Sequence, residues 1–296
     1  MRFLISVIVI VAPHLVVVDG AVAAAEQPRI VIAGCPGFCS GDSELFLVRP
    51  DLGERKRLTY NGRHDGAPAL SPNGKRVAYT CGGKGGHGDI CLLTLRSGKT
   101  VRITSTPQPD NSPTWSPDGT QIAFEREVES VPQEVANMTE IYVMDVNGEN
   151  VTRLTDDVTL DEAPEFSPDG SSLVFVSYSD GDSEITTLDI ESGERKQLTS
   201  NDDLDRDPTW SRNGSRIAWV VGDGELHIYL MNADGSDPVI ISERDAYGLD
   251  WATDSGRIAF TALEGEREIL NILKVQDGST KAVDLTRSWS YFRPDW

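Results

Sequence analysis

Short apolar stretches separated by turn residues recur along the chain, and each follows the same pattern of polar and hydrophobic positions. A Pro is followed two residues later by an aromatic residue or Leu, then by a tight turn, and then by β-branched residues and Ala. The copies begin at Pro68, Pro113, Pro164 and Pro208, with a degenerate fifth copy around Leu249 and a sixth, cut short, at Pro294. Short apolar runs bounded by Gly, Pro, Asn and Asp are typical of β-strands joined by hairpins.

The aromatic or Leu position of each copy returns at a nearly constant interval. These positions are Leu70, Trp115, Phe166, Trp210, Trp251 and Trp296, spaced 45, 51, 44, 41 and 45 residues apart. A second phrase, Leu-Thr or a close variant, keeps the same interval and begins at Leu58, Ile103, Leu154, Leu198, Ile241 and Leu285. A repeat of this length is typical of one blade of a β-propeller.

Each repeat resolves into four predicted strands. Pro-x-Trp is the first, Ile-Ala-Phe the second, a run such as residues 140–145 the third, and the segment ending in Leu-Thr the fourth. Ser-Pro-Asp-Gly forms the hairpin between the first two, because Pro presets φ and Gly supplies a positive φ. Meanders of about 45 residues bury both faces only by packing radially. We therefore predict an all-β, six-bladed β-propeller over residues 26–296.

The two ends of the chain predict how the ring closes. The last phrase stops after a first strand, at residues 291–296, whereas residues 29–59 supply a second, third and fourth strand. One blade is therefore expected to be assembled from both termini.

The Pro-x-Trp-Ser-Pro-Asp-Gly-x-x-Ile-Ala-Phe phrase, the Ile-Tyr-x-x-Asp run and the closing Leu-Thr resemble the repeats of TolB-type six-bladed propellers, which also recur in prolyl-oligopeptidase-type enzymes. The resemblance covers residues 26–296 and implies a stand-alone propeller without the N-terminal domain of TolB. It does not imply an activity, because one fold hosts many functions. The Gly-x-Ser-x-Gly elbow of an α/β-hydrolase does not occur in the sequence.

The N-terminus is typical of a secretory signal peptide. Arg2 precedes an apolar run over residues 3–18, and small residues at 21–25 lead to Glu26. We predict a signal peptide at 1–25, cleaved after Ala23 or Ala25, and a periplasmic or secreted mature protein. A permanent anchor is disfavoured because the run is short for a membrane span. Lipidation of Cys35 is disfavoured because residues 26–29 separate it from the run.

The charge balance narrows the class of partner. The 27 Lys and Arg residues against 47 Asp and Glu residues leave a net charge of −20. This field repels nucleic acid and anionic membranes, and it attracts cations, basic peptides and basic protein faces. The same acidic excess also confers solubility, whatever the partner. We expect a monomer that binds a protein or a basic peptide.

Four acidic residues share one register, three residues before the Pro of successive repeats: Asp65, Asp110, Asp161 and Asp205. We hypothesise that they converge at the mouth of the central channel and bind a partner or a cation, with Ca²⁺ as the candidate. The alternative is that each Asp caps its own loop. Metal-dependent hydrolysis of the six-bladed lactonase type is the enzymatic alternative to a non-enzymatic binding module.

The segment between the second and third strands of the repeat that begins at Pro113 is longer than its counterparts and acidic. It contains Glu127, Glu129 and Glu134 and is either a partner-recognition loop or a tolerated insertion.

The four cysteines, Cys35, Cys39, Cys81 and Cys91, are an even number in a predicted exported chain, which favours disulfides. Cys81 and Cys91 flank one loop between antiparallel strands, and Cys35 and Cys39 flank the corresponding loop of the closing blade. A zinc site made by Cys81, His87, Asp89 and Cys91 is the alternative.

Overall fold

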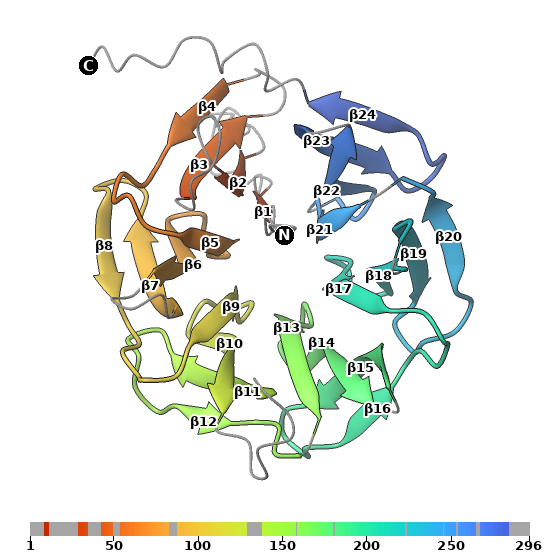
Figure 1. The fold of residues 1–296 in the computed structure, drawn as a ribbon, viewed down its shortest axis with the longest axis horizontal. Helices are drawn as coiled ribbons and strands as arrows, with labels where there is room; N and C mark the ends of the chain where they lie inside the picture. The colour runs from red at the N-terminus through yellow and green to blue at the C-terminus, as the bar shows by residue number, and fades with distance from the viewer. Residues whose placement is uncertain are drawn as a thin grey trace, which may run out of the picture.

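The computed structural model describes residues 9–11, 29–34, 43–49, 54–82, 88–128, 138–157, 159–179, 181–222, 224–244, 246–252, 254–264 and 267–283. In these ranges the regular structure consists of β-strands arranged in six four-stranded antiparallel sheets. Figure 1 shows the sheets as blades around a common centre, which confirms the predicted all-β, six-bladed propeller. Among the described residues, no helix is long and apolar enough to cross a membrane.

We number the blades in chain order. Blade 1 holds β1 (Val9–Val11), β2 (Arg29–Gly34), β3 (Glu44–Arg49) and β4 (Glu54–Arg57), and blade 2 holds β5 (Asp65–Leu70), β6 (Arg76–Gly82), β7 (Gly88–Thr94) and β8 (Lys99–Arg102). Blade 3 holds β9 (Asp110–Trp115), β10 (Gln121–Val128), β11 (Met138–Asp145) and β12 (Thr152–Arg153), and blade 4 holds β13 (Leu160–Phe166), β14 (Ser172–Ser179), β15 (Asp182–Asp189) and β16 (Arg195–Gln197). Blade 5 holds β17 (Asp205–Trp210), β18 (Arg216–Val221), β19 (His227–Asn232) and β20 (Val239–Ser242), and blade 6 holds β21 (Tyr247–Trp251), β22 (Arg257–Glu264), β23 (Arg267–Lys274) and β24 (Thr280–Val283).

The hairpins between first and second strands have the predicted turn chemistry. In blade 3 the Gly119 amide donates to the Ser116 carbonyl at 2.9 Å, and the Ser116 hydroxyl donates to the Asp118 carboxylate at 2.7 Å. The fourth position of the turn has a positive φ in each of four copies, at Gly74, Gly119, Gly170 and Gly214. The turn residues therefore specify the hairpin locally, without help from the rest of the ring.

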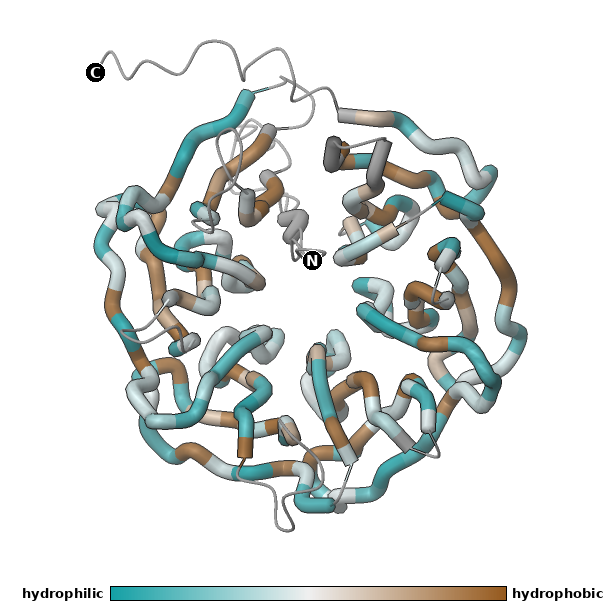
Figure 2. Tube along the Cα trace, viewed as in Figure 1, coloured by the Kyte–Doolittle hydropathy of each residue, from teal (hydrophilic) through white to brown (hydrophobic). Residues whose placement is uncertain are grey.

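The hydrophobic core lies between neighbouring blades. Hydrophobic residues gather on the strands inside the blades, and hydrophilic residues are common in the connecting loops (Figure 2). Six clusters of buried side chains each join two blades that are adjacent in the ring. One of them packs Ile30 and Val48 of blade 1 against Ala252, Ala259 and Leu270 of blade 6, so the ring is closed by core packing between the first and last blades.

The innermost strand of blade 1 comes from the N-terminal end of the chain. β1 pairs antiparallel with β2 with Val9 opposite Val31, at the position where we expected residues 291–296. The apolar segment Val9-Ile10-Val11 can pair there because β2 presents its inner edge. Residues 291–296, and the predicted signal peptide 1–25 apart from Val9–Val11, lie outside the described residues.

Candidate functional site

The four Asp residues singled out from the sequence lie at the same end of the sheets, at the start of the innermost strands of blades 2 to 5. Asp65, Asp110 and Asp205 begin β5, β9 and β17, and Asp161 is the second residue of β13. All four have no exposed area. The structure thus confirms their common register and places them beneath the surface.

Donors from nearby loops and strands hold each of these carboxylates. Asn61 donates to Asp65 at 2.8 Å, Arg126 to Asp110 at 2.6 Å, Arg195 to Asp161 at 2.9 Å, and Trp219 to Asp205 at 3.0 Å. The donors to all four carboxylates are side chains, and the alternative that each Asp caps its own loop stays a prediction. Direct binding of a partner or cation by these four residues stays a prediction. Their burial keeps the carboxylates from contact with the surface.

A second row of buried acids accompanies the first and was missed in the sequence. Glu44, Asp89, Glu140 and Glu184 each lie at the start of a third strand, and each precedes one of the four Asp residues by 21 positions. An Arg follows the first three by 13 positions and pairs with them: Arg57 with Glu44 at 2.8 Å, Arg102 with Asp89 at 2.9 Å, and Arg153 with Glu140 at 2.7 Å. The constant spacings of 13 and 21 were the signal that could have revealed this row.

Side-chain hydroxyl groups next to these acids link neighbouring blades. The side chain of Ser43 donates to the Asp65 carbonyl at 2.7 Å, and Ser183 donates to the Asp205 carbonyl at 2.9 Å. Thr139 makes the same bond to Asp161 at 2.9 Å. Each bond joins a residue at the start of a third strand, or just before it, to the innermost strand of the following blade. The acids of the two rows therefore lie at the seams between blades.

One group of acids has the spacing of a metal site. Oxygen atoms of Glu140, Asp157 and Asp161 lie within 4.8 Å of one another. However, Arg153 pairs with Glu140, and Arg195 pairs with both Asp157 and Asp161. The two guanidinium groups already compensate these carboxylates, so the protein supplies its own cations at this position.

Three carboxylates from strands of three neighbouring blades influence one another electrostatically. Glu125 of β10 accepts a hydrogen bond from the Ala163 amide at 2.9 Å, and Asp207 of β17 accepts one from the Gly248 amide at 3.0 Å. Glu162 of β13 lies close enough to both for their charges to raise its pKa. We call Glu125, Glu162 and Asp207 the central carboxylates.

Burial and the neighbouring negative charges disfavour ionisation of the central carboxylates. Burial, and then the charges of Glu125 and Asp207, raise the pKa of Glu162 to about 7, although Arg206 opposes this shift. Burial also raises the pKa of Glu125 and of Asp207 above the ordinary range. Such a cluster becomes easier to ionise when a basic side chain approaches it.

The innermost strands share a backbone feature that shapes this region. The residue before the repeated Pro has a positive φ at Ala67, Ser112, Ala163 and Asp207. The pairing register shifts at the same place in each of these blades. This bulge turns the Ala163 amide toward Glu125 of the preceding blade, where the two form the hydrogen bond described above.

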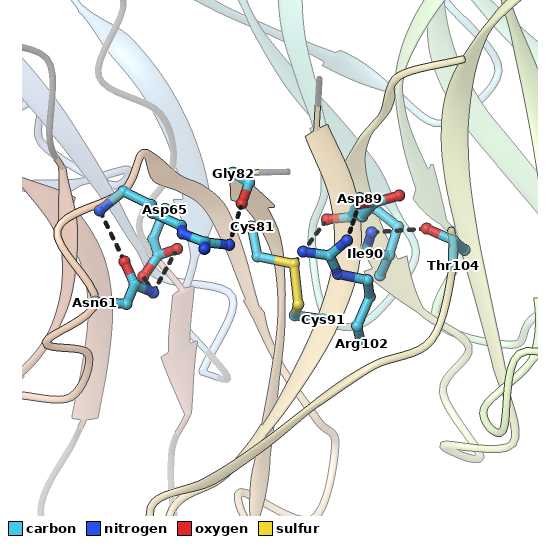
Figure 3. The surroundings of a disulfide bond; sticks show 10 residues. Asn61, Asp65, Cys81, Gly82, Asp89, Ile90, Cys91, Arg102 and Thr104 are labelled. Carbon is cyan, nitrogen blue, oxygen red and sulfur yellow. Dashed lines mark hydrogen bonds and ion pairs between the residues drawn. A yellow bond between two sulfur atoms is a disulfide. The ribbon is translucent and has the colours of Figure 1, made fainter. Parts of the chain in front are cut away.

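The predicted disulfide between Cys81 and Cys91 is present, with a Cα–Cα distance of 5.8 Å. Figure 3 shows it between β6 and β7, beside the Asp89–Arg102 ion pair. The zinc alternative at Cys81, His87, Asp89 and Cys91 is therefore wrong, since both sulfur atoms are bonded to each other. Cys35, Cys39 and His87 lie outside the described residues.

The predicted partner loop is described only at its beginning. Glu127 lies in β10, and its amide donates to the Pro109 carbonyl at 3.0 Å. Glu129 and Glu134 lie outside the described residues, so recognition through this loop stays a prediction.

The sequence profile of the TolB beta propeller domain matches residues 36–155 and 132–296. The crystal structure of TolB from Acinetobacter baumannii is similar with a TM-score of 0.74 and 24% identity, covering 85% of this chain and 62% of that chain. The chain therefore spans less than two thirds of the length of that structure.

Two further solved structures are similar over most of this chain. The putative TolB from Agrobacterium tumefaciens gives a TM-score of 0.69 at 18% identity, covering 79% of this chain and 85% of that chain. Oligogalacturonate lyase in complex with manganese gives 0.62 at 14% identity, covering 86% of this chain and 73% of that chain. No curated protein matches the chain. At these identities the structural likeness shows the fold and does not carry an activity.

Proposed function

Because the chain belongs to the TolB beta propeller domain family, we propose that it is a non-enzymatic binding module that recognises a basic segment of a protein partner. The main support is the group formed by the central carboxylates, which three strands of three blades bring close enough for their charges to interact. A Lys or Arg side chain entering this group would relieve their mutual repulsion and allow Glu162 to ionise. The net charge of −20 would draw such a partner toward the protein.

Binding through this group predicts proton release. Glu162 is about half protonated near pH 7, since its pKa is raised to about 7. An incoming cation lowers that pKa and releases part of a proton to the buffer. Calorimetry in two buffers of different ionisation enthalpy should therefore give different binding enthalpies for the same partner peptide.

A defined cationic probe tests the proposal. Fluorescence anisotropy would measure binding of a labelled decalysine peptide to the wild-type chain and to the triple variant Glu125→Gln, Glu162→Gln, Asp207→Asn. The amide replacements keep acceptors for the Ala163 and Gly248 amides, so folding should survive. A matched variant with the same charge change, Glu191→Gln, Glu194→Gln, Asp237→Asn, alters exposed acids in turns at the other end of the sheets.

The proposal requires the first variant to bind the probe at least about ten-fold more weakly than the matched variant, a difference of about 1.4 kcal/mol. Equal weakening in both variants would mean that net charge alone attracts the peptide. A natural partner can then be sought by cross-linking in envelope extract, with the same two variants as comparison.

We also propose that the protein works outside the cytoplasm. The Cys81–Cys91 disulfide supports this location, because such bonds persist in oxidising compartments. The N-terminal pattern of residues 1–25 supports it independently. Cleavage there would remove β1 and free the inner edge of β2 for the predicted strand at residues 291–296. N-terminal sequencing of the protein from a periplasmic or culture fraction should find a chain that starts at Ala24 or Glu26, whereas an intact Met1 would contradict export with cleavage.

A further inference from the structure

Gln197 interrupts the charge pattern of the acid rows. In blades 1 to 3 the residue 13 positions after the first acid is an Arg, and in blade 4 it is Gln197. The Gln197 amide donates to the Thr199 carbonyl at 2.9 Å, as the Arg153 Nε donates to the Thr155 carbonyl at 2.7 Å. Gln197 thus keeps the position and one hydrogen bond of the arginine, but it brings no positive charge to Glu184.

Asp205 lacks the arginine that Asp110 and Asp161 of the two preceding blades have. Asp110 lies opposite Arg126 in the sheet register, whereas Asp205 lies opposite Val221. The donors that reach Asp205 are neutral: the Trp219 indole at 3.0 Å and the Asn201 amide at 3.3 Å. Within the described residues, no salt bridge joins either Glu184 or Asp205 to a basic side chain.

Glu184 has an acceptor that nothing satisfies. Its side chain is buried with 3% exposure, and its Oε1 atom accepts a hydrogen bond from the Asn201 amide at 3.0 Å. Its Oε2 atom is buried and has no hydrogen-bond partner. Asn201 links the two acids, because its backbone amide donates to Glu184 and its side-chain amide donates to Asp205 at 3.3 Å. A buried carboxylate without an ion-pair partner strongly destabilises the fold unless a positive group compensates its charge.

We propose that Glu184 and Asp205 together bind one divalent metal ion that prefers oxygen ligands, such as Ca²⁺, at the seam between blades 4 and 5. The ion replaces the arginines that serve the two preceding acid pairs, where two positive charges face two negative ones. Carboxylate oxygens are the ligands that Ca²⁺ and Mg²⁺ prefer, and Ca²⁺ tolerates the less regular arrangement that a seam provides. The ion fixes the third strand of blade 4 against the innermost strand of blade 5.

This inference extends beyond partner binding and does not rest on it. The residues differ from the central carboxylates, and the predicted effect is on the stability of the ring rather than on recognition. Failure of either proposal therefore leaves the other standing.

Terbium luminescence and thermal unfolding test the site directly. Tb³⁺ occupies Ca²⁺ sites, and Trp219 donates to Asp205 and so lies close enough to sensitise a bound Tb³⁺. After treatment with EDTA, the full chain should show a saturable luminescence signal at one Tb³⁺ per chain that Ca²⁺ displaces. At a Ca²⁺ concentration about 100 times the dissociation constant, the Tm should rise by about 5 °C.

Two variants decide the assignment. Gln197→Arg restores the guanidinium of the sister blades, so it should abolish the Ca²⁺ effect and keep a Tm in EDTA at or above that of the wild type. Glu184→Gln should also abolish the effect. Val239→Arg, on an exposed outer strand, adds the same charge elsewhere and should respond to Ca²⁺ as the wild type does.

Three results would overturn the site. A Ca²⁺ response that persists unchanged in Gln197→Arg would place the ion elsewhere on the acidic surface. An equal loss of response in Val239→Arg would show that net charge controls it. No Ca²⁺ or Mg²⁺ response in the folded wild-type chain would mean that a proton, and not a metal ion, compensates the pair.

Discussion

Arg126 holds the fully buried carboxylate of Asp110 in a two-point ion pair, with Nε at 2.6 Å from Oδ1 and Nη2 at 2.9 Å from Oδ2. The two residues are register partners on neighbouring strands of blade 3. The guanidinium also lies over the rings of Phe124 and Tyr142, at 5.2 Å and 4.9 Å from their centroids. The pair therefore satisfies an acid that the fold has removed from water.

Removing Arg126 should destabilise the protein, because the buried Asp110 carboxylate would lose its positively charged partner. Arg126→Ala is expected to lower the free energy of unfolding by about 3–5 kcal/mol, measured by urea denaturation near pH 7. The double variant Arg126→Ala, Asp110→Asn should recover part of this loss, because the remaining amide carries no charge. If the double variant were as unstable as the sum of the two single variants, the ion pair would not be the source of the effect.

Replacing Glu162 by Gln should stabilise the protein at high pH and leave it unchanged at low pH. The folded pKa of Glu162 is raised to about 7, above its ordinary value of 4.5, so the folded state resists ionisation. Stability is therefore lost as the pH rises from about 4.5 to 7, and Glu162→Gln removes this contribution. We expect a gain of about 1–2 kcal/mol at pH 8 and no gain at pH 4.

Denaturation of the Glu162→Gln variant across pH 4 to 8 measures this effect, with the exposed substitution Glu191→Gln as control. Some pH dependence should remain, because burial also raises the pKa of Glu165 to about 7. A Glu162→Gln variant that is less stable than the wild type at pH 8 would show that Glu162 makes a favourable charged contact instead.

Loss of the Cys81–Cys91 disulfide should weaken blade 2 without unfolding the protein under mild conditions. The bond closes a loop with a sequence separation of 10, for which the chain-entropy estimate is about 2.5–3 kcal/mol. The double variant Cys81→Ser, Cys91→Ser should lose about that much stability in thermal or urea unfolding. Adding a reductant to this variant isolates any contribution of the disulfide predicted for Cys35 and Cys39.

The architecture was predictable from the sequence because every blade encodes its hairpin locally. Ser116, Pro117, Asp118 and Gly119 form the expected turn, and Trp115 anchors the strand by donating from its indole to the Ala69 carbonyl of the preceding blade at 2.9 Å. Such features repeat with the blade, so their period was visible. The Cys81–Cys91 bridge followed from its place across one strand pair.

The two rows of acids could be predicted only in part, because the burial and the partners of each acid depend on how neighbouring blades pack. The register of Asp205 was readable, but its burial and its proximity to Glu184 follow from how blade 4 packs on blade 5. The central carboxylates escaped detection because Glu125, Glu162 and Asp207 occupy different positions in their repeats. No period connects them, and the closed ring alone brings them together.

Two glycines at corresponding turns test how tightly the blades fit. Gly98 lies in the β7–β8 turn with φ +67° and nothing within 4 Å of an added Cβ, whereas Gly148 lies in the β11–β12 turn with φ +86° and an added Cβ only 2.4 Å from the Ile103 carbonyl oxygen. Gly98→Ala should cost about 1 kcal/mol, the usual penalty for a left-handed backbone.

Gly148→Ala should cost that amount and about 1–3 kcal/mol more, because the turn must move away from the segment that follows blade 2. Urea unfolding of both variants measures the difference, and the matched glycine removes the backbone contribution from the comparison. Equal losses would mean that the turn of blade 3 can shift freely. A larger loss at Gly148 would show that packing at the outer rim, as well as the buried clusters, fixes the position of one blade on the next.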